Sequence, residues 1–168
     1  EAIRFAALEI SGVREATITQ APYGMGSAEL VIVPEQNGDV AQIVANASAA
    51  AQARRPIGTR LFIKTPTTKS LDVSVDLIIP GATSAQLVET VIKRATVGIN
   101  RYLNSLLPGK PLVYNRFISV IIDSSDVVKD VIIKSLVLNG TEIMRRNYQT
   151  SNDEQIVPGA ITVKVATS

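Results

Sequence analysis

The most regular pattern of apolar and polar positions in the chain lies at residues 70–79, SLDVSVDLII. Its apolar side chains alternate with serines and aspartates, and they are Leu71, Val73, Val75, Leu77 and Ile79. Because successive side chains of a strand point to opposite faces of the sheet, this period of two predicts a strand with one buried face and one wet face. Such a strand is typical of an antiparallel sheet packed on one side.

A second pattern, with apolar residues three or four positions apart, predicts the longest helix at residues 84–106,. The stripe expected to be buried comprises Val88, Val91, Ile92, Ala95, Ile99, Tyr102, Leu103 and Leu106,. Thr83 and Gln86 have the spacing of a capping box, so we expect them to satisfy free backbone N–H groups at the start of this helix. Residues 112–123 are predicted to form a second, shorter helix.

Similar patterns predict a helix, a hairpin and another helix in the first part of the chain. The first helix covers residues 2–9, and one side of it is formed by Ile3, Ala6, Ala7 and Ile10,. Strands at 13–20 and 28–34 flank the turn APYGMGS and predict a hairpin with a longer loop,. Asp39 is expected to cap the next helix, and Gln42 can bond back to it as in a capping box.

The sequence ARRPIGTRLFIKTPT, residues 53–67, has a local explanation at each position. Arg54 and Arg55 are expected in the last turn of a helix, where cations interact favourably with the helix dipole. Pro56 cannot continue that helix, because it has no N–H and its ring clashes with the preceding turn. Gly58 permits the turn that follows, and the apolar, β-prone run RLFIKT begins the next strand.

Three further strands are predicted at residues 60–65, 127–138 and 161–167,. In the last of these, the side chains expected to face the core are Ile161, Val163 and Val165. Residues 139–160 have little pattern, and a connection of 22 residues is unusual in a small domain,. This segment is therefore either an interaction arm or a region with elements that the pattern does not reveal.

Together these elements predict an α+β fold made of two small subdomains. Residues 1–67 form the first (helix, hairpin, helix, strand), and residues 68–168 form the second (strand, two helices, two strands with a long connecting loop). We expect mostly antiparallel sheets with the helices packed on one face. The sequences VREATI (13–18) and VKDVII (128–133) share a pattern, which indicates either a repeated helix–strand–strand unit or a chance match between alternating strands,.

Composition narrows the classes of function. Of the 168 residues, 46% are hydrophobic and 19% are charged, which is typical of an ordered globular protein,. The chain contains neither cysteine nor histidine, which excludes thiolate and imidazole metal ligands as well as Ser-His-Asp and Cys-His catalytic groups,. The redox compartment is left undetermined. No apolar run in the sequence is long enough to predict a membrane span.

Three motifs with candidate chemistry have ordinary structural explanations. Asp72 and Asp76 lie four positions apart on a predicted strand, or about 13 Å at about 3.3 Å per residue, which is too far for a pair of hydrolytic carboxylates. Asp123, Asp126 and Asp130 lack the glycine and the final glutamate of a calcium loop and are expected to form turns. The glycines of YGMGSAE lead into a strand, unlike those of a dinucleotide-binding loop. We therefore predict no catalytic, metal or cofactor-binding residue and no enzyme activity.

A basic stripe leaves nucleic-acid binding as the alternative function. The stripe at 54–64 would consist of Arg54, Arg55, Arg60, Lys64 and Phe62, with an extension by Arg145 and Arg146. A net charge of only +2 and a total of seven aromatic residues argue against this role, because nucleic-acid binding needs strong positive charge and aromatic stacking,. Solvated side chains, or ion pairs across a subunit interface, explain the same residues.

Several motifs follow one another in a distinctive order. ISGVREATI precedes a hairpin, a helix rich in small residues ends in RRPIGT, and LDVSVDLII comes next. The chain continues with the helix ending in YLNSLLPGKPLVYNRFISVI, then DSSDVVKDVIIKSL, and closes on NYQTSNDEQIVPGAITVKV. This order resembles the baseplate J-like protein family of contractile phage tails and related injection machines. The resemblance covers essentially the whole chain but only the C-terminal half or so of a typical member.

The resemblance implies a structural component of a contractile-tail baseplate, in a phage or a prophage-like particle, without catalytic or cofactor residues. The family's turn matches at Arg55, Pro56, Ile57, Gly58 and Thr59, for which it implies a structural turn role. The implied partners are other baseplate wedge proteins and neighbouring copies of the same chain. The implied location is the tail baseplate of the particle, and the host cytoplasm during assembly. Because the sequence starts on a glutamate and not on Met, we expect a piece of a longer protein.

Overall fold

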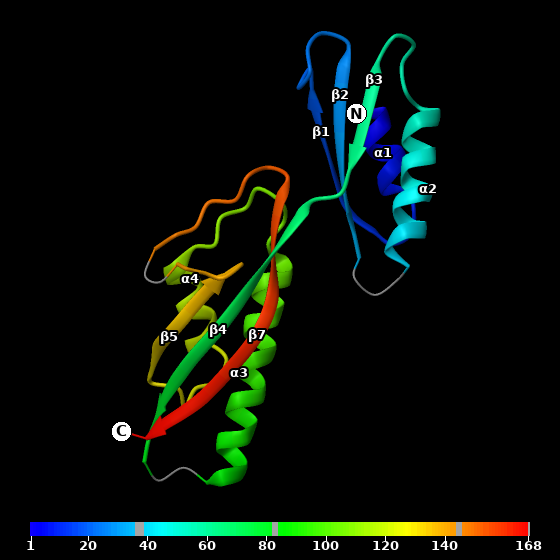
Figure 1. Ribbon diagram of the computed structural model, residues 1–168. Coiled ribbons are helices and arrows are strands. Elements are labelled where there is room, and N and C mark those ends of the chain that lie inside the picture. Colours follow the sequence, from blue (N-terminus) through cyan, green and yellow to red (C-terminus); the bar gives the residue numbers. More distant parts are fainter. Residues whose placement is uncertain (36–38, 82–83, 144–145, 168) are drawn as a thin grey trace. The chain divides into compact units, whose positions relative to one another are not determined.

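Figure 1 shows the computed structural model of the chain, which describes residues 1–35, 39–81, 84–143 and 146–167. Contacts between Cα atoms divide the chain into two units, Glu1–Thr67 and Thr68–Ser168. Each unit contains its own sheet and its own cluster of buried apolar side chains. Each unit therefore has the parts of a separate folding core.

The first unit is a three-stranded sheet with two helices on one face (Figure 1). Its elements are α1 (Ala2–Leu8), β1 (Val13–Gln20), β2 (Ser27–Pro34), α2 (Val40–Ala53) and β3 (Arg60–Lys64). β1 and β2 pair antiparallel, which confirms the predicted hairpin. β3 pairs with β2 in parallel. A parallel pair needs a crossover connection, and α2 provides it between these two strands.

Small side chains form much of the core of the first unit. The fully buried alanines, which come from both helices and from β1, are Ala7, Ala16, Ala47 and Ala51. Leu30 of β2 lies opposite Ile18 of β1 and Ile63 of β3, and all three pack against this cluster. Because alanine has no rotamer freedom to lose, burying it costs little entropy, and its small size lets the helices approach the sheet closely.

The starts of two helices agree with the sequence prediction only in part. The Asp39 side chain accepts a hydrogen bond from the backbone N–H of Gln42 over 3.2 Å, as predicted for α2. The Gln42 side chain donates to Asn46 one turn further on, so the expected capping box is only half formed. At the start of α3, where the sequence predicted a cap at Thr83, the Ser84 side chain accepts a capping hydrogen bond from the backbone N–H of Leu87 over 3.3 Å. Thr83 itself lies outside the described residues.

The second unit is a four-stranded sheet of order β6-β5-β4-β7, and two helices pack against one of its faces (Figure 1). Its elements are β4 (Thr67–Ile79), α3 (Ala85–Ser105), α4 (Tyr114–Ile122), β5 (Asp130–Leu138), β6 (Thr141–Glu142) and β7 (Glu154–Thr167). β5 pairs antiparallel with both β4 and β6, whereas β7 runs in the same direction as β4 (Figure 1). Both sheets are therefore mixed, and the predicted α+β class is confirmed.

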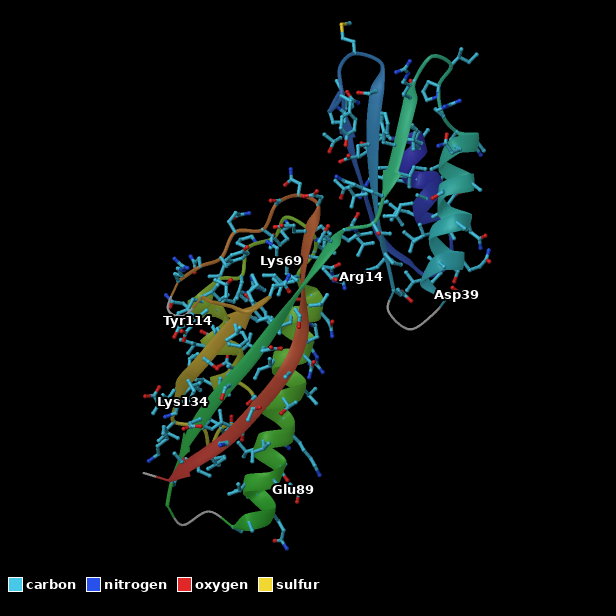
Figure 2. All side chains as sticks on the ribbon, viewed as in Figure 1. Arg14, Asp39, Lys69, Glu89, Tyr114 and Lys134 are labelled. Carbon is cyan, nitrogen blue, oxygen red and sulfur yellow. The ribbon has the colours of Figure 1, made fainter. Side chains whose placement is uncertain are left out.

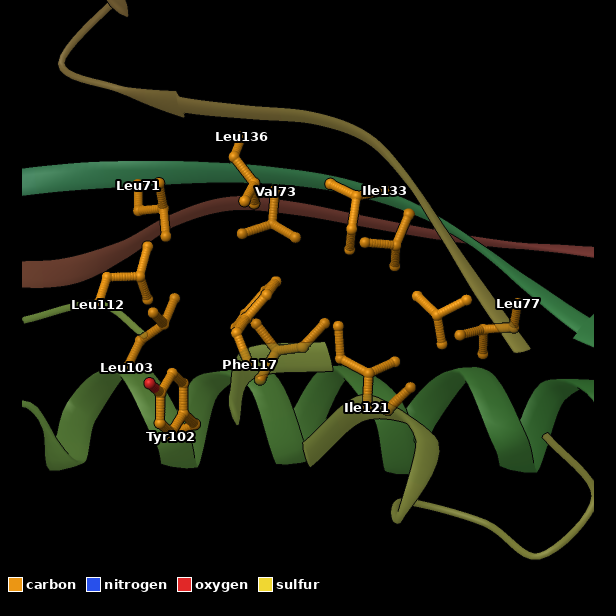
Figure 3. Close-up of a cluster of buried hydrophobic side chains, with 14 of the residues drawn as sticks. Leu71, Val73, Leu77, Tyr102, Leu103, Leu112, Phe117, Ile121, Ile133 and Leu136 are labelled. Atoms are coloured by element: carbon orange, nitrogen blue, oxygen red, sulfur yellow. The ribbon is translucent and has the colours of Figure 1, made fainter. Parts of the chain in front are cut away.

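The predicted apolar face of β4 forms the centre of the larger core (Figure 3). Its residues are at most 2% exposed, and they are Leu71, Val73, Val75, Leu77 and Ile79. The buried residues that α3 contributes are Val91, Ala95, Ile99, Tyr102 and Leu103. Val88 and Ile92 of the predicted stripe are only half-buried. Phe117 and Ile121 of α4 are fully buried and complete the core.

β7 starts at Glu154, seven residues before the strand predicted at 161–167. Pro158 and Gly159 cause the discrepancy, because both residue types normally interrupt a strand. β7 is an edge strand, where a proline without an N–H group is tolerated,. Gly159 lies where a side chain would overlap polar groups of β4, so the glycine permits the close approach of the two strands.

The segment 139–160 contains ordered structure that the sequence pattern did not reveal. It includes β6 and the first half of β7. Between them, Tyr148 pairs with Leu112 through two backbone hydrogen bonds of 2.8 and 3.0 Å. Further on, the buried side chain of Gln155 donates to the carbonyl of Leu106 over 3.1 Å. The described part of the segment is therefore packed along the connection between α3 and α4 and does not project as an arm.

Two glycines of the second unit with different surroundings test how closely β7 approaches β4. A Cβ on Gly98 in α3 would lie at least 3.7 Å from its neighbours. Gly98→Ala should therefore raise the free energy of unfolding by about 0.5–1 kcal/mol through helix propensity. A Cβ on Gly159 would overlap the side chains of Asp72 and Ser70. Gly159→Ala should therefore lower the free energy of unfolding by about 1–3 kcal/mol. Urea unfolding measures both changes, and an unchanged stability of Gly159→Ala would contradict the close approach of β7 to β4.

Candidate interaction surfaces

The RPIGT turn connects α2 to β3. α2 ends before Arg54 and Arg55, which lie just beyond the helix and not in its last turn as predicted. The backbone N–H of Thr59 donates to the carbonyl of Pro56 over 3.1 Å, and Gly58 has a φ of +83°. Residues with a side chain rarely adopt a φ in this range, so the turn uses the conformational freedom of the glycine.

Two turns lie side by side at one end of the three-stranded sheet (Figure 1). One joins α2 to β3, and the other is the hairpin turn between β1 and β2. The backbone N–H of Arg60 donates to the carbonyl of Gly26 over 2.7 Å and links them. A Cβ on Gly26 would lie 3.5 Å from the carbonyl oxygen of Gly58. The two turns therefore form one continuous surface.

Four large apolar side chains are exposed on this surface, and we call them the apolar tip: Tyr23, Met25, Ile57 and Phe62. Met25 and Ile57 are fully exposed, at 102% and 106% of their reference areas. The rings of Tyr23 and Phe62 pack edge to face with their centroids 4.7 Å apart. Apolar side chains gathered on a surface are typical of sites that contact another protein.

The sequence prediction did not include the apolar tip, although a signal was present. Met25 lies within YGMGS and Ile57 within RPIGT, which are both turn sequences with glycine. Such turns are normally built from glycine, proline and small polar residues, so a large apolar residue in the middle of each is the signal. Only the folded chain shows that the two turns are neighbours.

A buried carboxylate beside the tip fixes one of its rings. Glu29 of β2 is only 9% exposed and accepts a hydrogen bond from Tyr23 Oη over 2.7 Å. Its other carboxylate oxygen lies 3.1 Å from Nζ of Lys64 on β3. A charge removed from water needs such partners, because burying it unpaired is costly. These contacts therefore hold the tyrosine ring in its place next to Phe62.

The basic stripe considered for nucleic-acid binding is only partly available for that role. Lys64 is paired with the buried carboxylate of Glu29, and the ring of Phe62 packs against that of Tyr23. The stripe residues that are exposed and form no ion pair with any described residue are Arg54, Arg55 and Arg60. Arg146 is exposed in the second unit, and Arg145 lies outside the described residues. Nucleic-acid binding at 54–64 therefore stays an alternative that depends on three arginines.

The aspartates considered as candidate chemistry have structural surroundings. Asp72 accepts a hydrogen bond of 2.8 Å from the backbone of β7, and Asp76 pairs with Lys134 over 3.3 Å. Asp123 follows α4 and Asp130 starts β5, at the junctions where turns were expected. Among the described residues, no three His, Cys, Asp or Glu side chains come close enough to hold a metal ion. No helix in the described ranges is long and apolar enough to cross a membrane.

One ion pair joins the beginning of β4 to the beginning of β7. Lys69, labelled in Figure 2, has its Nζ 2.8 Å from Glu154 Oε1 and 3.0 Å from Tyr148 Oη. The hydrogen bond from Lys69 lowers the pKa of the Glu154 carboxyl, and a backbone hydrogen bond from Ser151 lowers it further. The hydrogen bonds to Glu154 and Tyr148 in turn raise the pKa of Lys69. The pair therefore fastens the start of β7, within the 139–160 segment, to β4.

The fold of this chain is similar to that of proteins of known structure. One of them is a chain in the cryo-EM structure of the anti-feeding prophage (AFP) baseplate, 6-fold symmetrised. The TM-score is 0.64 at 8% sequence identity, over 93% of this chain and 36% of that chain. This chain thus spans about a third of the other chain's length, and at this identity the likeness shows the fold alone. No family model matches the sequence, and the search of curated proteins found no match.

The structural role assigned to Arg55, Pro56, Gly58 and Thr59 can be tested at the glycine. Apart from the two chain neighbours of Gly58, no described residue has an atom within 4 Å of a Cβ placed there, so the cost of a side chain is conformational. Gly58→Val should lower the free energy of unfolding by about 1–2 kcal/mol, because a β-branched residue is strained at a positive φ. Arg54→Ala should change it by less than about 0.5 kcal/mol, as expected of an exposed side chain. Thermal melting ranks the stability of the two variants. A larger loss of stability for Arg54→Ala than for Gly58→Val would count against the turn role.

The pair of Lys69 and Glu154 should make stability depend on pH. Because folding lowers the pKa of Glu154, its contribution is fully present above the ordinary value of 4.5 and is lost as the pH falls through the lowered pKa,. Because folding raises the pKa of Lys69, its contribution is fully present below 10.5 and is lost as the pH rises through the raised pKa,. Glu154→Gln should therefore melt below the parent chain at about pH 7 and together with it at about pH 2.

The matched control for this pH dependence is Glu142→Gln. It removes an exposed carboxylate of the same unit that forms no ion pair with the described residues. Its melting temperature should follow that of the parent chain at both pH values. If Glu154→Gln and Glu142→Gln behaved alike, the ion pair would have no measurable role in holding the connection.

Proposed function

We propose that this chain is a structural component of the baseplate of a contractile-tail particle and acts through protein–protein contacts. The observation that carries the proposal is the fold likeness to a chain of the AFP baseplate, which extends over 93% of this chain. The motif order that resembles the baseplate J-like family is a separate support, because an identity of 8% carries almost no sequence information. Membership of that family is part of the proposal.

The proposed partners are other baseplate wedge proteins and neighbouring copies of the same chain. The apolar tip supports contacts of this kind. Met25 and Ile57 contribute nothing to the core of their own unit, since both remain fully exposed after folding. Burial against a partner would remove their side chains from water, at about 25 cal/mol for each Å² of apolar surface. The tip is therefore the surface of the first unit that we expect to be covered in the particle.

The proposed role is non-enzymatic and requires no cofactor and no small-molecule substrate. Its location would be the tail baseplate of a virion or phage-like particle, and the host cytoplasm during assembly. A contact surface of this kind needs a rigid support, because ordering side chains and loops on binding costs free energy. The hydrogen bond from Arg60 to Gly26 and the contacts of Glu29 supply that support for the tip.

The location is tested by electron microscopy of purified particles with a labelled antibody against this chain. We expect label at the baseplate end of the tail, because a structural component must be retained in the finished particle. Label confined to the cytoplasm of producing cells, with none on particles, would contradict the proposal.

The same assay applied to variants tests whether the tip makes the contacts. Met25→Asp combined with Ile57→Asp should reduce incorporation by on the order of tenfold or more, because the new charges would have to lose their water in the contact. The isolated variant should melt like the parent chain, since both side chains are fully exposed. Val40→Asp changes a 42% exposed aliphatic residue at the start of α2, and this control should be incorporated normally. Equal incorporation of all variants would remove the tip from the proposal.

A further inference from the structure

α3 and α4 pack as an antiparallel pair in the second unit. Gly98 of α3 lies at their close approach, where a Cβ would be 3.7 Å from the carbonyl oxygen of Val120 and 3.8 Å from Cβ of Ser124. Further along α3, the ring of Tyr102 lies with its centroid 6.0 Å from that of Phe117. Later residues of α3 thus contact earlier residues of α4, so α4 runs back along α3.

A groove of about 690 Å³ follows the solvent side of this helix pair. Its lining on α3 extends from Lys93 to Ser105, which is about 18 Å at a rise of 1.5 Å per residue,. The middle of the groove is apolar and is formed by Val97, Gly98 and Val120. Val97 is 55% exposed, although it lies in the middle of a helix that is packed on the core. A concave apolar floor of this size is typical of a site that binds a ligand or a peptide.

Positive charge is concentrated along this groove. The described residues that line it include four cations, Lys93, Arg94, Arg101 and Arg116, and one carboxylate, Asp123. The described lining therefore carries a net charge of +3, more than the +2 of the whole chain with its 17 basic and 15 acidic residues. A groove lined by one sign of charge raises the local concentration of groups of the opposite sign.

Three of the four cations have no charged partner within the described chain. Lys93 pairs over 2.7 Å with Glu89, which is labelled in Figure 2, and both side chains are largely exposed. Arg94, Arg101 and Arg116 are exposed and form no ion pair with any described residue. A guanidinium group binds a carboxylate through two parallel hydrogen bonds, so these three side chains are suited to acidic residues of a partner.

A buried hydroxyl group also indicates an occupant. Ser124 lines the groove just beyond the end of α4, and its Oγ is buried without a hydrogen-bond partner among the described residues. A buried hydroxyl without a partner costs free energy, which a hydrogen-bonding group of an occupant would recover.

We propose that the groove between α3 and α4 docks an acidic, amphipathic segment of a partner protein. Apolar side chains of the segment pack on Val97 and Val120, and its carboxylates pair with Arg94 at one end and with Arg101 and Arg116 at the other. A helix of about twelve residues has the length of the groove. The proposal rests on the proposed function in one respect, because it takes the partner to be a protein of the same particle.

Other occupants fit the chemistry of the groove less well. The described helices of a second copy offer no acidic face, because Glu89 of α3 is the only acidic residue within α1, α2, α3 and α4. Single-stranded nucleic acid needs exposed aromatic rings for stacking, and Tyr102, the aromatic residue of the lining, is only 8% exposed,. The aliphatic middle and charged ends of the groove match a segment with apolar residues between acidic ones.

The test measures binding of a fluorescein-labelled peptide to the purified chain by fluorescence anisotropy. The probe is a helical peptide of about twelve residues with leucines on one face and glutamates towards both ends, and its reference has glutamines in place of the glutamates. The parent chain should bind the reference at least about tenfold more weakly than the probe. Arg101→Glu combined with Arg116→Glu should weaken binding of the probe on the order of tenfold or more, because two attractive contacts become repulsive.

The matched control is Arg54→Glu combined with Arg55→Glu in the first unit. It changes the net charge by the same amount but leaves the groove intact, so binding should stay within about twofold of the parent chain. Thermal melting checks that both double variants fold. If the groove variant does not fold, Arg101→Gln combined with Arg116→Gln replaces it, with an expected loss of about three- to tenfold.

Several results would overturn the proposal. They are absence of probe binding at low salt, equal binding of the probe and its reference, and equal losses in the two double variants. Binding of a single-stranded oligonucleotide, lost only in the groove variant and without probe binding, would assign the groove to nucleic acid. A dimer in sedimentation velocity that only the groove variant dissociates would assign it to a second copy. None of these results changes where the labelled antibody binds on particles, so failure of this proposal is distinguishable from failure of the proposed function.

Discussion

Burial of one face of β4 is the constraint on which the second unit depends. Five alternating side chains of this strand are removed from water almost completely, and the hydrophobic effect is the largest favourable term in folding,. β5 and β7 flank β4 in the sheet, and α3 and α4 cover the apolar face (Figure 3). The same packing decides what the helices present to solvent. The turn of α3 that buries Ile99 and Tyr102 leaves Val97 and Arg101 outside, so the charged groove is a consequence of how the core is closed.

The first unit uses a different balance of side chains. Its helices contribute mainly alanines to the core, while two large apolar residues, Met25 and Ile57, lie in turns and stay fully exposed. Such an arrangement gives up apolar burial that the unit could have used for its own stability. The apolar tip and the groove between α3 and α4 differ in chemistry, since one is apolar and the other cationic with an apolar floor. Both are proposed contact surfaces, and both are supported by regular elements.

The sequence predicted elements well wherever a single element decided the pattern. The alternation in β4 and the stripe of α3 arise from residues that are neighbours on one strand or one helix. The prediction failed where contacts with a neighbouring element determine which residue a position tolerates. The last strand was predicted to start only at residue 161, but β7 also includes Pro158, which an edge position tolerates, and Gly159, which the side chains of β4 require,. The tip and the groove were missed for a related reason, because their residues come from segments far apart in the chain.

By itself, the sequence determined the class of the fold, most of its helices and strands, and the absence of cysteine and histidine chemistry. It could do so because periodicity, capping and composition are properties of short segments. The tertiary structure alone decided that β3 joins β2 in parallel, that β7 continues through its proline, and that four cations line one groove. These features depend on contacts between residues distant in sequence. Such contacts stabilise the chain only after folding has ordered both residues of each contact.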